Sequence, residues 1–233
     1  MTSLLRYDSD GVISTITLDD GKANALSVEM LAQINTALDH AQRDKCAVLI
    51  TGREGMFSGG FDLGVFRTER EQVFAMLKAG AELTERLLSF PAPVIGACSG
   101  HAIAMGVFLL LSTDVRIGIK NGPFKIAVNE VQIGMTLPRF AIEVCRQRLT
   151  PAAFNRALIT AEAHDHDRAV EAGFLDYVVP ASEFHDAVRT RAVALAKLGR
   201  DAYIATKHRV RAQTLSALRR AIEIDIEDWR DRA

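Results

Sequence analysis

The sequence predicts an α/β fold with buried strands, because short apolar runs alternate with amphipathic helical patterns along the chain. Segments 47–52 (AVLITG), 92–100 (APVIGACSG) and 114–119 (DVRIGI) are almost wholly apolar, as strands covered on both faces are. The first two each run into a glycine-containing loop and then into a helical pattern. Because this strand–loop–helix unit repeats, we expect layered α/β architecture with the strands inside.

The N-terminal elements follow from local signals. Residues 4–18 alternate partly in polarity around Asp10-Gly11, which is a hairpin signal. Ser27 is a capping residue with Glu29 in the first turn of the helix that follows. The apolar face of that helix carries Met30, Leu31, Ile34 and Leu38. After a loop at 53–66, a second amphipathic helix directs a set of side chains toward a core, namely Val73, Leu77, Leu83, Leu87 and Leu88.

The remaining elements continue the pattern. Residues 102–111 (AIAMGVFLLL) predict a buried helix, too short to span a bilayer, and 124–128 a further strand. Thr150-Pro151 starts a helix, and 167–180 reads as helix, glycine stop, short strand and proline stop. From residue 181 the pattern is helical, so we divide the chain into a core at 1–180 and a helical region at 181–233. One buried stripe is expected within 203–224, formed by Ile204, Val210, Leu215, Leu218 and Ile222.

Composition excludes several classes of protein. Hydrophobic residues make up 48% and charged residues 24% of the chain, and the net charge is −1. Nothing in this balance favours nucleic acid or an anionic membrane as a partner. The three cysteines, Cys46, Cys98 and Cys145, are odd in number and far apart, which argues against a disulfide framework and favours a reducing compartment. The start of the chain shows no signal-peptide pattern, so we expect a cytoplasmic protein.

Two glycine loops have the composition of a ligand site. FSGGFDLG (57–64) and GHAIAMG (100–106) both lie where an apolar strand passes into a helix. Glycines there let backbone N–H groups approach a ligand, and two such loops can donate to one oxygen as an oxyanion hole. The plainer interpretation is that the glycines only permit tight turns.

Other functional templates fit less well. The chain has no GxxxxGK[ST] phosphate loop, and GGFDLG lacks the GxGxxG spacing of a dinucleotide site. Ser99 lies one position late for a GxSxG nucleophile elbow, which leaves Ser99 with His101 as a weak hydrolase candidate. In HDHD (164–167), Asp165 and Asp167 are better read as helix caps and solvated charges than as metal ligands, so no metal site is expected.

One carboxylate stands out by its neighbours. In NEVQIGMTLP (129–138), Glu130 is surrounded by apolar residues, which an ionised carboxylate avoids unless something compensates it. The residue is either exposed beside a buried strand or an acid/base in a dry pocket, and the local sequence is compatible with both.

Several segments, in order along nearly the whole chain, resemble the enoyl-CoA hydratase/isomerase (crotonase) family. FSGGFDLG resembles the FxxGxDL loop of that family, and PAPVIGACSGHAIAMGVFLLLSTDVRI resembles its second glycine loop and flanking strands. GKANALSVEM, NEVQIGMTLP and AVEAGFLDYVVP are similar to the NALxxxM, PExxLGxxP and AxxxGLVxxVVP signatures. The resemblance implies a spiral of repeated ββα units with a C-terminal helical extension, assembled as trimers or dimers of trimers through the 181–233 region.

The resemblance also implies a substrate and a set of site residues. Family members bind acyl-coenzyme A thioesters, with coenzyme A as part of the substrate and no separate cofactor, and stabilise an enolate at the thioester oxygen. By position in the motifs, the backbone N–H groups of Phe61 and Met105 are the oxyanion donors. Gly106, which follows Met105, is expected to contact the substrate. The segment around Lys22 and Ala23 is expected to bind the nucleotide part of coenzyme A. The first loop adds Asp62, Leu63 and Gly64, where many members have lysine in place of Gly64, and Lys207 is expected to reach a coenzyme A phosphate.

The most informative departure concerns the catalytic acids. Family hydratases use two glutamates, and Phe108 occupies the position of the first, which leaves Glu130 alone. Moving a double bond from position 3 to position 2 needs one base, whereas adding water divides the work between two acids. The resemblance therefore favours a Δ3,Δ2-enoyl-CoA isomerase with Glu130 as proton shuttle. The alternatives are an enoyl-CoA hydratase with one glutamate and a non-catalytic acyl-CoA-binding protein.

Overall fold

A large parallel sheet forms one layer of the protein, whose computed structural model describes residues 3–232. Its spatial order is β1-β2-β3-β5-β7-β10, and only β1 is antiparallel to its neighbour. The strands are β1 Leu5–Ser9, β2 Ile13–Leu18, β3 Ala47–Gly52, β5 Val94–Cys98, β7 Val115–Ile119 and β10 Tyr177–Val179. The hairpin at 4–18 and the three apolar strands expected from the sequence are thus confirmed.

A second, smaller sheet has the order β4-β6-β8-β9. It contains β4 Gly55–Ser58, β6 Gly100–Ile103, β8 Lys125–Ala127 and β9 His164–Asp165, with β4, β6 and β8 parallel and β9 antiparallel. The expectation that 53–66 and 100–106 are loops throughout is therefore wrong, since each begins with a strand. These strands are four residues long and contain glycine, so no period of two can show in the sequence.

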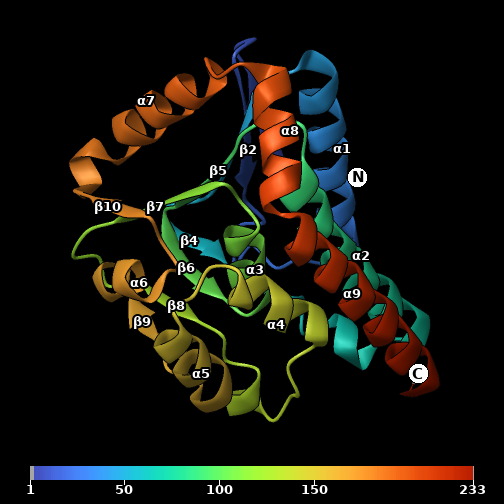
Figure 1. Ribbon diagram of the computed structural model, residues 1–233. Coiled ribbons are helices and arrows are strands. Elements are labelled where there is room, and N and C mark those ends of the chain that lie inside the picture. The colour runs from blue at the N-terminus through green and yellow to red at the C-terminus, as the bar shows by residue number, and fades with distance from the viewer. Residues whose placement is uncertain (1–2, 233) are drawn as a thin grey trace.

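Helices connect and cover the sheets (Figure 1). They are α1 Val28–Asp44, α2 Arg70–Ser89, α3 Met105–Leu111, α4 Arg139–Arg146, α5 Pro151–Thr160, α6 His166–Ala172, α7 Phe184–Ala196, α8 Arg200–Val210 and α9 Ala212–Arg232, with short 3₁₀ turns at Val65–Arg67, Val131–Ile133 and Ala181–Glu183. Ser27 caps α1 as expected, because its hydroxyl accepts a hydrogen bond from Met30 N at 3.2 Å. The units β3-β4-α2 and β5-β6-α3 confirm the ββα repeat.

Two apolar clusters hold the layers together. The larger joins the helices to both sheets, and the smaller lies where α7 packs on the outer face of the large sheet, around Ile13, Ile95 and Phe184. At the C-terminal end of the chain, α9 runs alongside α2 (Figure 1). Of the stripe expected at 203–224, Leu215, Leu218 and Ile222 are buried, but Val210 is 77% exposed. The prediction that Val210 belongs to the buried stripe was wrong, because α8 ends at Val210 and a separate helix, α9, begins at Ala212. The apolar face of α9 is therefore not in register with that of α8.

Candidate active site

Three segments leave the small sheet at one edge. Because β4, β6 and β8 are parallel, with Ser58 opposite Ala102 and Ile103 opposite Ala127, their carboxyl ends are adjacent. Phe61 comes three residues after β4, Met105 two residues after β6 and Glu130 three residues after β8. Ligands of open α/β sheets bind outside the carboxyl ends of parallel strands. The sheet topology therefore groups the expected oxyanion donors and the expected base at one ligand-binding edge.

The two glycine loops touch each other through their backbones. Gly60 has a φ of 94°, and a Cβ there would lie 2.9 Å from the carbonyl oxygen of Ile103 and 3.3 Å from Met105 N, so only glycine fits. Ala104 has a φ of 51°, which strains the backbone immediately before Met105, and its N–H donates to Ala127 O at 2.9 Å. Within residues 3–232 no hydrogen bond to a protein acceptor is made by the N–H of Phe61 or Met105, so both N–H groups are unpaired there.

The side chains next to these donors pack on α2. A Cβ at Gly80 would lie 2.5 Å from the Phe61 ring and 3.3 Å from Cε of Met105, so both side chains meet α2 at the same point. Gly106, in the first turn of α3, packs against the backbone of Ser58. The start of α3 is therefore fixed against β4 and the first loop, which is what a preorganised pair of donors requires.

Two polar residues that the sequence analysis did not single out hold the first loop in place. Asn24 is fully buried, and its amide donates to the carbonyl oxygens of Met56 at 3.0 Å and Phe57 at 3.1 Å. Ser58 Oγ donates to Asn24 O at 2.8 Å and accepts from Gly60 N at 3.2 Å. Buried polar groups must be paired, so this network ties the loop to the chain before α1. The available signal was the asparagine in GKANAL, a motif quoted for its resemblance only.

The segment expected to hold coenzyme A lies beside the same loop. Ala23 O accepts a hydrogen bond from Gly59 N at 2.7 Å, and Lys22 next to it is exposed. In the loop itself, Asp62 Oδ1 accepts from Gly64 N at 2.8 Å, and Leu63 is 61% exposed. Ala23 is thus hydrogen-bonded to the loop that carries Phe61, one of the expected oxyanion donors, and the role of this segment in holding coenzyme A stays a prediction.

Glu130 is buried, and one of its carboxylate oxygens has no partner in the part of the protein that the structure describes. The residue is only 7% exposed, and its Oε2 atom makes no hydrogen bond within the described chain. Burial raises the pKa of this carboxyl from its ordinary value of 4.5 to about 7, against a smaller opposing effect of a backbone hydrogen bond. The pKa of the Cys145 thiol, in α4, is raised mainly by burial and in smaller part by the nearby charge of Glu130. No other charged group among residues 3–232 contributes to the Glu130 shift, so the carboxyl stands alone.

Phe108, which by resemblance occupies the position of the first hydratase glutamate, is packed among apolar side chains. It lies in α3 with 1% exposure, and its ring meets that of Phe140 edge-on with centroids 5.9 Å apart. This packing joins α3 to α4 and replaces any polar group at that point with apolar surface.

The structure does not bring Lys207 to this site. Lys207 is 7% exposed, and its Nζ donates to Asp114 Oδ2 at 2.9 Å and to Ala92 O at 3.4 Å. The expectation that it contacts a coenzyme A phosphate is therefore corrected. Its ammonium is paired with a carboxylate on a distant part of the chain, which a helical charge pattern cannot reveal.

The weaker candidates are also accounted for. Ser99 Oγ donates to Arg53 O at 2.9 Å, whereas His101 Nδ1 accepts from Lys125 N at 3.0 Å, so the two side chains form no nucleophile–base pair. Asp165 caps α6 through Arg168 N, and Asp167 accepts from Asn121 N, both as expected for structural carboxylates.

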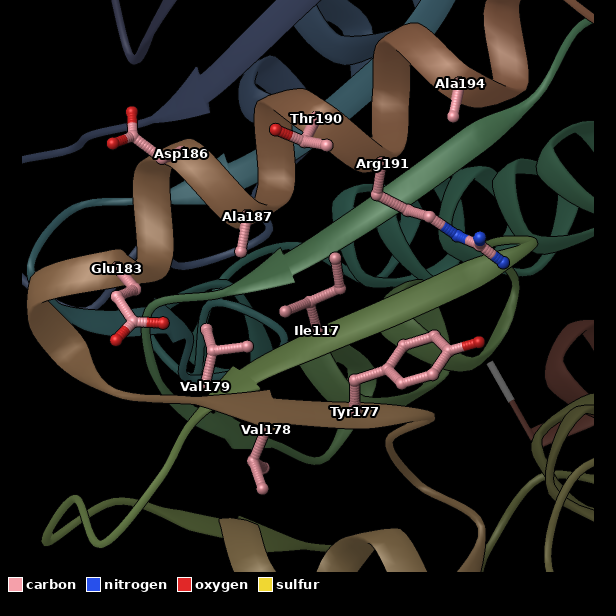
Figure 2. A pocket seen from close by; sticks show the side chains of 10 residues that line it. All are labelled: Ile117, Tyr177, Val178, Val179, Glu183, Asp186, Ala187, Thr190, Arg191 and Ala194. Carbon is pink, nitrogen blue, oxygen red and sulfur yellow. The ribbon is translucent and has the colours of Figure 1, made fainter.

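A hollow of about 620 Å³ lies apart from the strand ends, between α7 and the edge strand β10 (Figure 2). Its walls include Ile117 and Val179 from the sheet and Ala187 from α7, and none of the expected site residues lines it. This hollow is therefore separate from the residues expected to form the reaction site.

Comparison with known proteins agrees with this geometry. A family model described as enoyl-CoA hydratase/isomerase matches residues 8–231. The chain belongs to the enoyl-CoA hydratase/isomerase family. Its α/β spiral is the crotonase fold of that family, and the protein is an isomerase or hydratase of the crotonase superfamily that acts on acyl-CoA. No helix within residues 3–232 is both long and apolar enough to cross a membrane.

Individual members of the enoyl-CoA hydratase/isomerase family resemble the chain over nearly its full length. The mitochondrial enoyl-CoA delta isomerase 1 of Rattus norvegicus is 26% identical, with 97% of this chain and 80% of the relative covered. An enoyl-CoA hydratase structure from Mycobacterium ulcerans has a TM-score of 0.93 at 42% identity, covering 97% and 99% of the two chains. A Mycobacterium tuberculosis protein, described as an enoyl-CoA isomerase in one structure, has a TM-score of 0.91 at 41% identity, covering 96% and 97% of the two chains, and a second structure of it is described as a probable enoyl-CoA hydratase. Similar relatives thus carry both names.

Proposed function

We propose that the protein is an enoyl-CoA isomerase that converts a 3-enoyl-CoA into a 2-enoyl-CoA. The observation that carries the proposal is the solitary buried carboxyl of Glu130, with Phe108 in place of a second acid. A shift of a double bond needs one group that takes a proton and returns it, which a single carboxylate can do.

In the proposed reaction, Glu130 removes a proton from C2 of the substrate. The electron pair of the broken C2–H bond forms a C1–C2 double bond, and the thioester oxygen takes up negative charge. The resulting dienolate is stabilised by the N–H groups of Phe61 and Met105, which need no reorganisation because the loops are already in contact. Protonated Glu130 then delivers the proton to C4, which leaves a C2–C3 double bond and restores the thioester.

The environment of Glu130 suits a shuttle. A carboxyl with a pKa of about 7 is a stronger base than an exposed glutamate, yet it gives the proton back without a large barrier. The apolar packing of Phe108 against Phe140 provides no group to position water, which hydration requires. Lys22, Ala23, Asp62, Leu63 and Gly64 are the groups we assign to the coenzyme A part of the substrate, and Gly106 and Phe108 to the acyl end.

The second candidate is a hydratase with one glutamate, favoured by the similarity to the Mycobacterium ulcerans hydratase. Incubation with 3-enoyl-CoA and with 2-enoyl-CoA in separate reactions distinguishes the two. We expect rapid loss of the 3-enoyl isomer and no 3-hydroxyacyl product. Rapid formation of 3-hydroxyacyl-CoA from the 2-enoyl substrate would contradict the isomerase and establish the hydratase.

The role of Glu130 is tested by Glu130→Gln, which keeps the shape and removes the ionisable group. We expect turnover of 3-enoyl-CoA to fall by about three orders of magnitude or more, with retained binding of a saturated acyl-CoA. Glu143→Gln is the control, since Glu143 pairs with Arg146 near the surface of α4 and should leave turnover unchanged. Full activity of Glu130→Gln would exclude Glu130 as the base.

We propose further that residues 181–233 support assembly into trimers or dimers of trimers, as the family resemblance implies. Light scattering of the intact protein should then give three or six times the chain mass of 25.5 kDa. A mass of one or two chains would contradict this assembly.

A further inference from the structure

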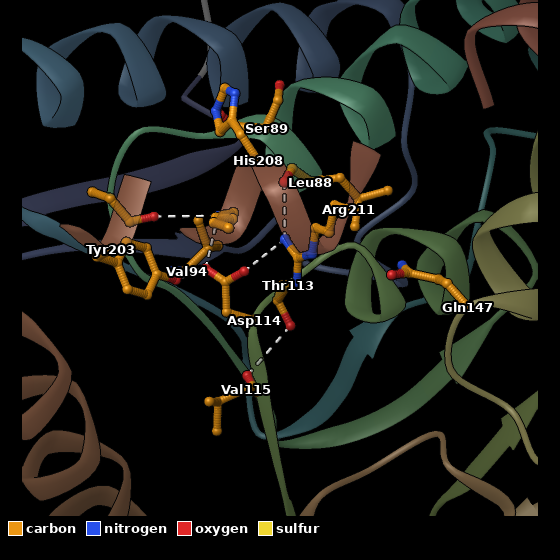
Figure 3. A network of polar contacts seen from close by, with 12 residues as sticks. Leu88, Ser89, Val94, Thr113, Asp114, Val115, Gln147, Tyr203, His208 and Arg211 are labelled. Atoms are coloured by element: carbon orange, nitrogen blue, oxygen red, sulfur yellow. Dashed lines mark hydrogen bonds and ion pairs between the residues drawn. The ribbon is translucent and has the colours of Figure 1, made fainter. Parts of the chain in front are cut away.

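A buried cluster of charges lies at the opposite end of α3 from Met105. Asp114 follows α3, and its carboxylate accepts hydrogen bonds from Val94 N at 2.8 Å, Tyr203 Oη at 2.7 Å and Lys207 Nζ at 2.9 Å. The other carboxylate oxygen pairs with Arg211 Nη1 at 2.7 Å (Figure 3). Since α3 has seven residues, about 10 Å of helix separates this cluster from the oxyanion donors.

Two further arginines join the cluster with part of their hydrogen-bonding capacity unused. Arg116, whose side chain is 3% exposed, pairs with Asp176 through Nη2, but its Nε and Nη1 are buried without partners. Arg148 donates from Nη2 to Thr113 O at 2.8 Å, and its buried Nε also lacks a partner. Buried N–H groups of a guanidinium are costly to leave unpaired, so three such atoms in one place require an explanation.

The charges of the cluster do not balance. Four cations, namely Arg116, Arg148, Lys207 and Arg211, face two carboxylates, Asp114 and Asp176, and these six side chains act on one another. Burial, followed by repulsion from Arg116 and Arg211, lowers the pKa of Arg148 to about 10, which leaves it charged at neutral pH. The six side chains thus carry two excess positive charges, which uncharged water molecules would not neutralise.

A hollow of about 590 Å³ opens at the two arginines. Arg116, Arg148 and Asp176 line it, together with Gln147, Leu175 and Tyr177. We propose that this hollow binds one phosphate group, held by the guanidinium groups of Arg116 and Arg148, whose buried, unpaired N–H groups turn toward the ion when it binds. A phosphate oxyanion supplies both the negative charge and the acceptor atoms that the cluster lacks, and guanidinium groups match its geometry. The phosphate can be the free ion or a monoester of a larger molecule.

The test is a titration of the intact protein with inorganic phosphate and, separately, with glycerol phosphate, at ionic strength held constant with sodium chloride. A ligand that binds only the folded state raises Tm along a saturating curve. We expect this rise and a matching heat of binding by calorimetry. A larger effect of glycerol phosphate would assign the site to a phosphomonoester, and an equal or smaller effect to the free ion. Identical Tm and no heat of binding in phosphate and in chloride would overturn the proposal.

Two arginines two residues apart provide a matched pair of variants. Arg148→Lys keeps the positive charge but removes the planar donor Nε, so we expect the phosphate-dependent rise in Tm to fall at least several-fold. Arg146→Lys, at a side chain that is 57% exposed and pairs with Glu143, should retain the full rise. Because the wild-type titration does not depend on either variant folding, the proposal can fail on that measurement alone. Equal phosphate responses of the two variants would also refute it.

Discussion

Replacing Glu130 with glutamine is predicted to make the folded protein more stable at alkaline pH while it removes catalysis. The pKa of Glu130 is about 7 in the folded state, whereas its ordinary value is 4.5. Between these values the unfolded chain has released the proton and the folded chain still holds it. The folded state therefore binds more protons, so its stability falls as the pH rises from 4.5 to 7. Glutamine has no proton to lose and escapes this fall.

The magnitude follows from the two pKa values. Their difference, at about 1.4 kcal/mol for each pH unit, means that the ionised carboxyl reduces the free energy of unfolding by about 3 kcal/mol above pH 7. Near pH 4.5 the folded wild-type protein and the folded variant both carry a neutral side chain at position 130. Their free energies of unfolding should therefore differ little. The stability gained by Glu130→Gln should thus grow from near zero at pH 4.5 to about 3 kcal/mol at pH 8.

Urea unfolding of both proteins at the two pH values measures this directly, since all other titrating groups are shared and cancel in the difference. Glu143→Gln is again the control, because a surface ion pair contributes only about 0–1 kcal/mol and that change should not follow the Glu130 titration. A Glu130→Gln difference that is the same at both pH values would refute the assignment of a strongly raised pKa to Glu130.

Three further predictions concern catalysis and the loops. The kcat/KM for 3-enoyl-CoA should rise with pH and level off above about 7, because only ionised Glu130 accepts a proton; a rate independent of pH between 5 and 8 would contradict this. Gly60→Ala should lower kcat by about a hundredfold or more, since its methyl group would lie 2.9 Å from Ile103 O and displace the donors; the check is steady-state kinetics, with unchanged turnover as the contrary result. Asn24→Ala should destabilise the protein by about 1–3 kcal/mol in urea unfolding, because the carbonyl oxygens of Met56 and Phe57 lose their buried partner; Asn155→Ala, at an exposed amide in α5, should change it by about 0.5 kcal/mol or less.

Membership of the family does not specify the reaction, and the reaction we propose depends on few residues. The sheet order brings the ends of β4, β6 and β8 together, and the proposed oxyanion donors Phe61 and Met105 would serve either reaction. The distinction we draw rests on one position in α3, where Phe108 packs on Phe140. Similar relatives carry the names of a hydratase and of an isomerase, so the fold alone does not distinguish the two reactions.

The sequence by itself determined the long elements and the order of the motifs. The strands at 47–52, 92–100 and 114–119, the cap at Ser27 and the amphipathic helix expected after the first loop all depend on contacts near in sequence or on apolar runs long enough to show. The two glycine-containing segments were predicted only in part, because each contains a strand too short to show in the sequence.

Only the tertiary structure decided how exposed the key charges are. Val131 and Ile133, the apolar neighbours of Glu130, are 48% and 50% exposed, whereas the carboxylate between strand β8 and its 3₁₀ turn is buried. Lys207, on a helix rich in charge, is buried against Asp114, which lies 93 residues away in the chain. Burial is set by what packs on a residue from distant segments, and no local pattern of polarity contains that information.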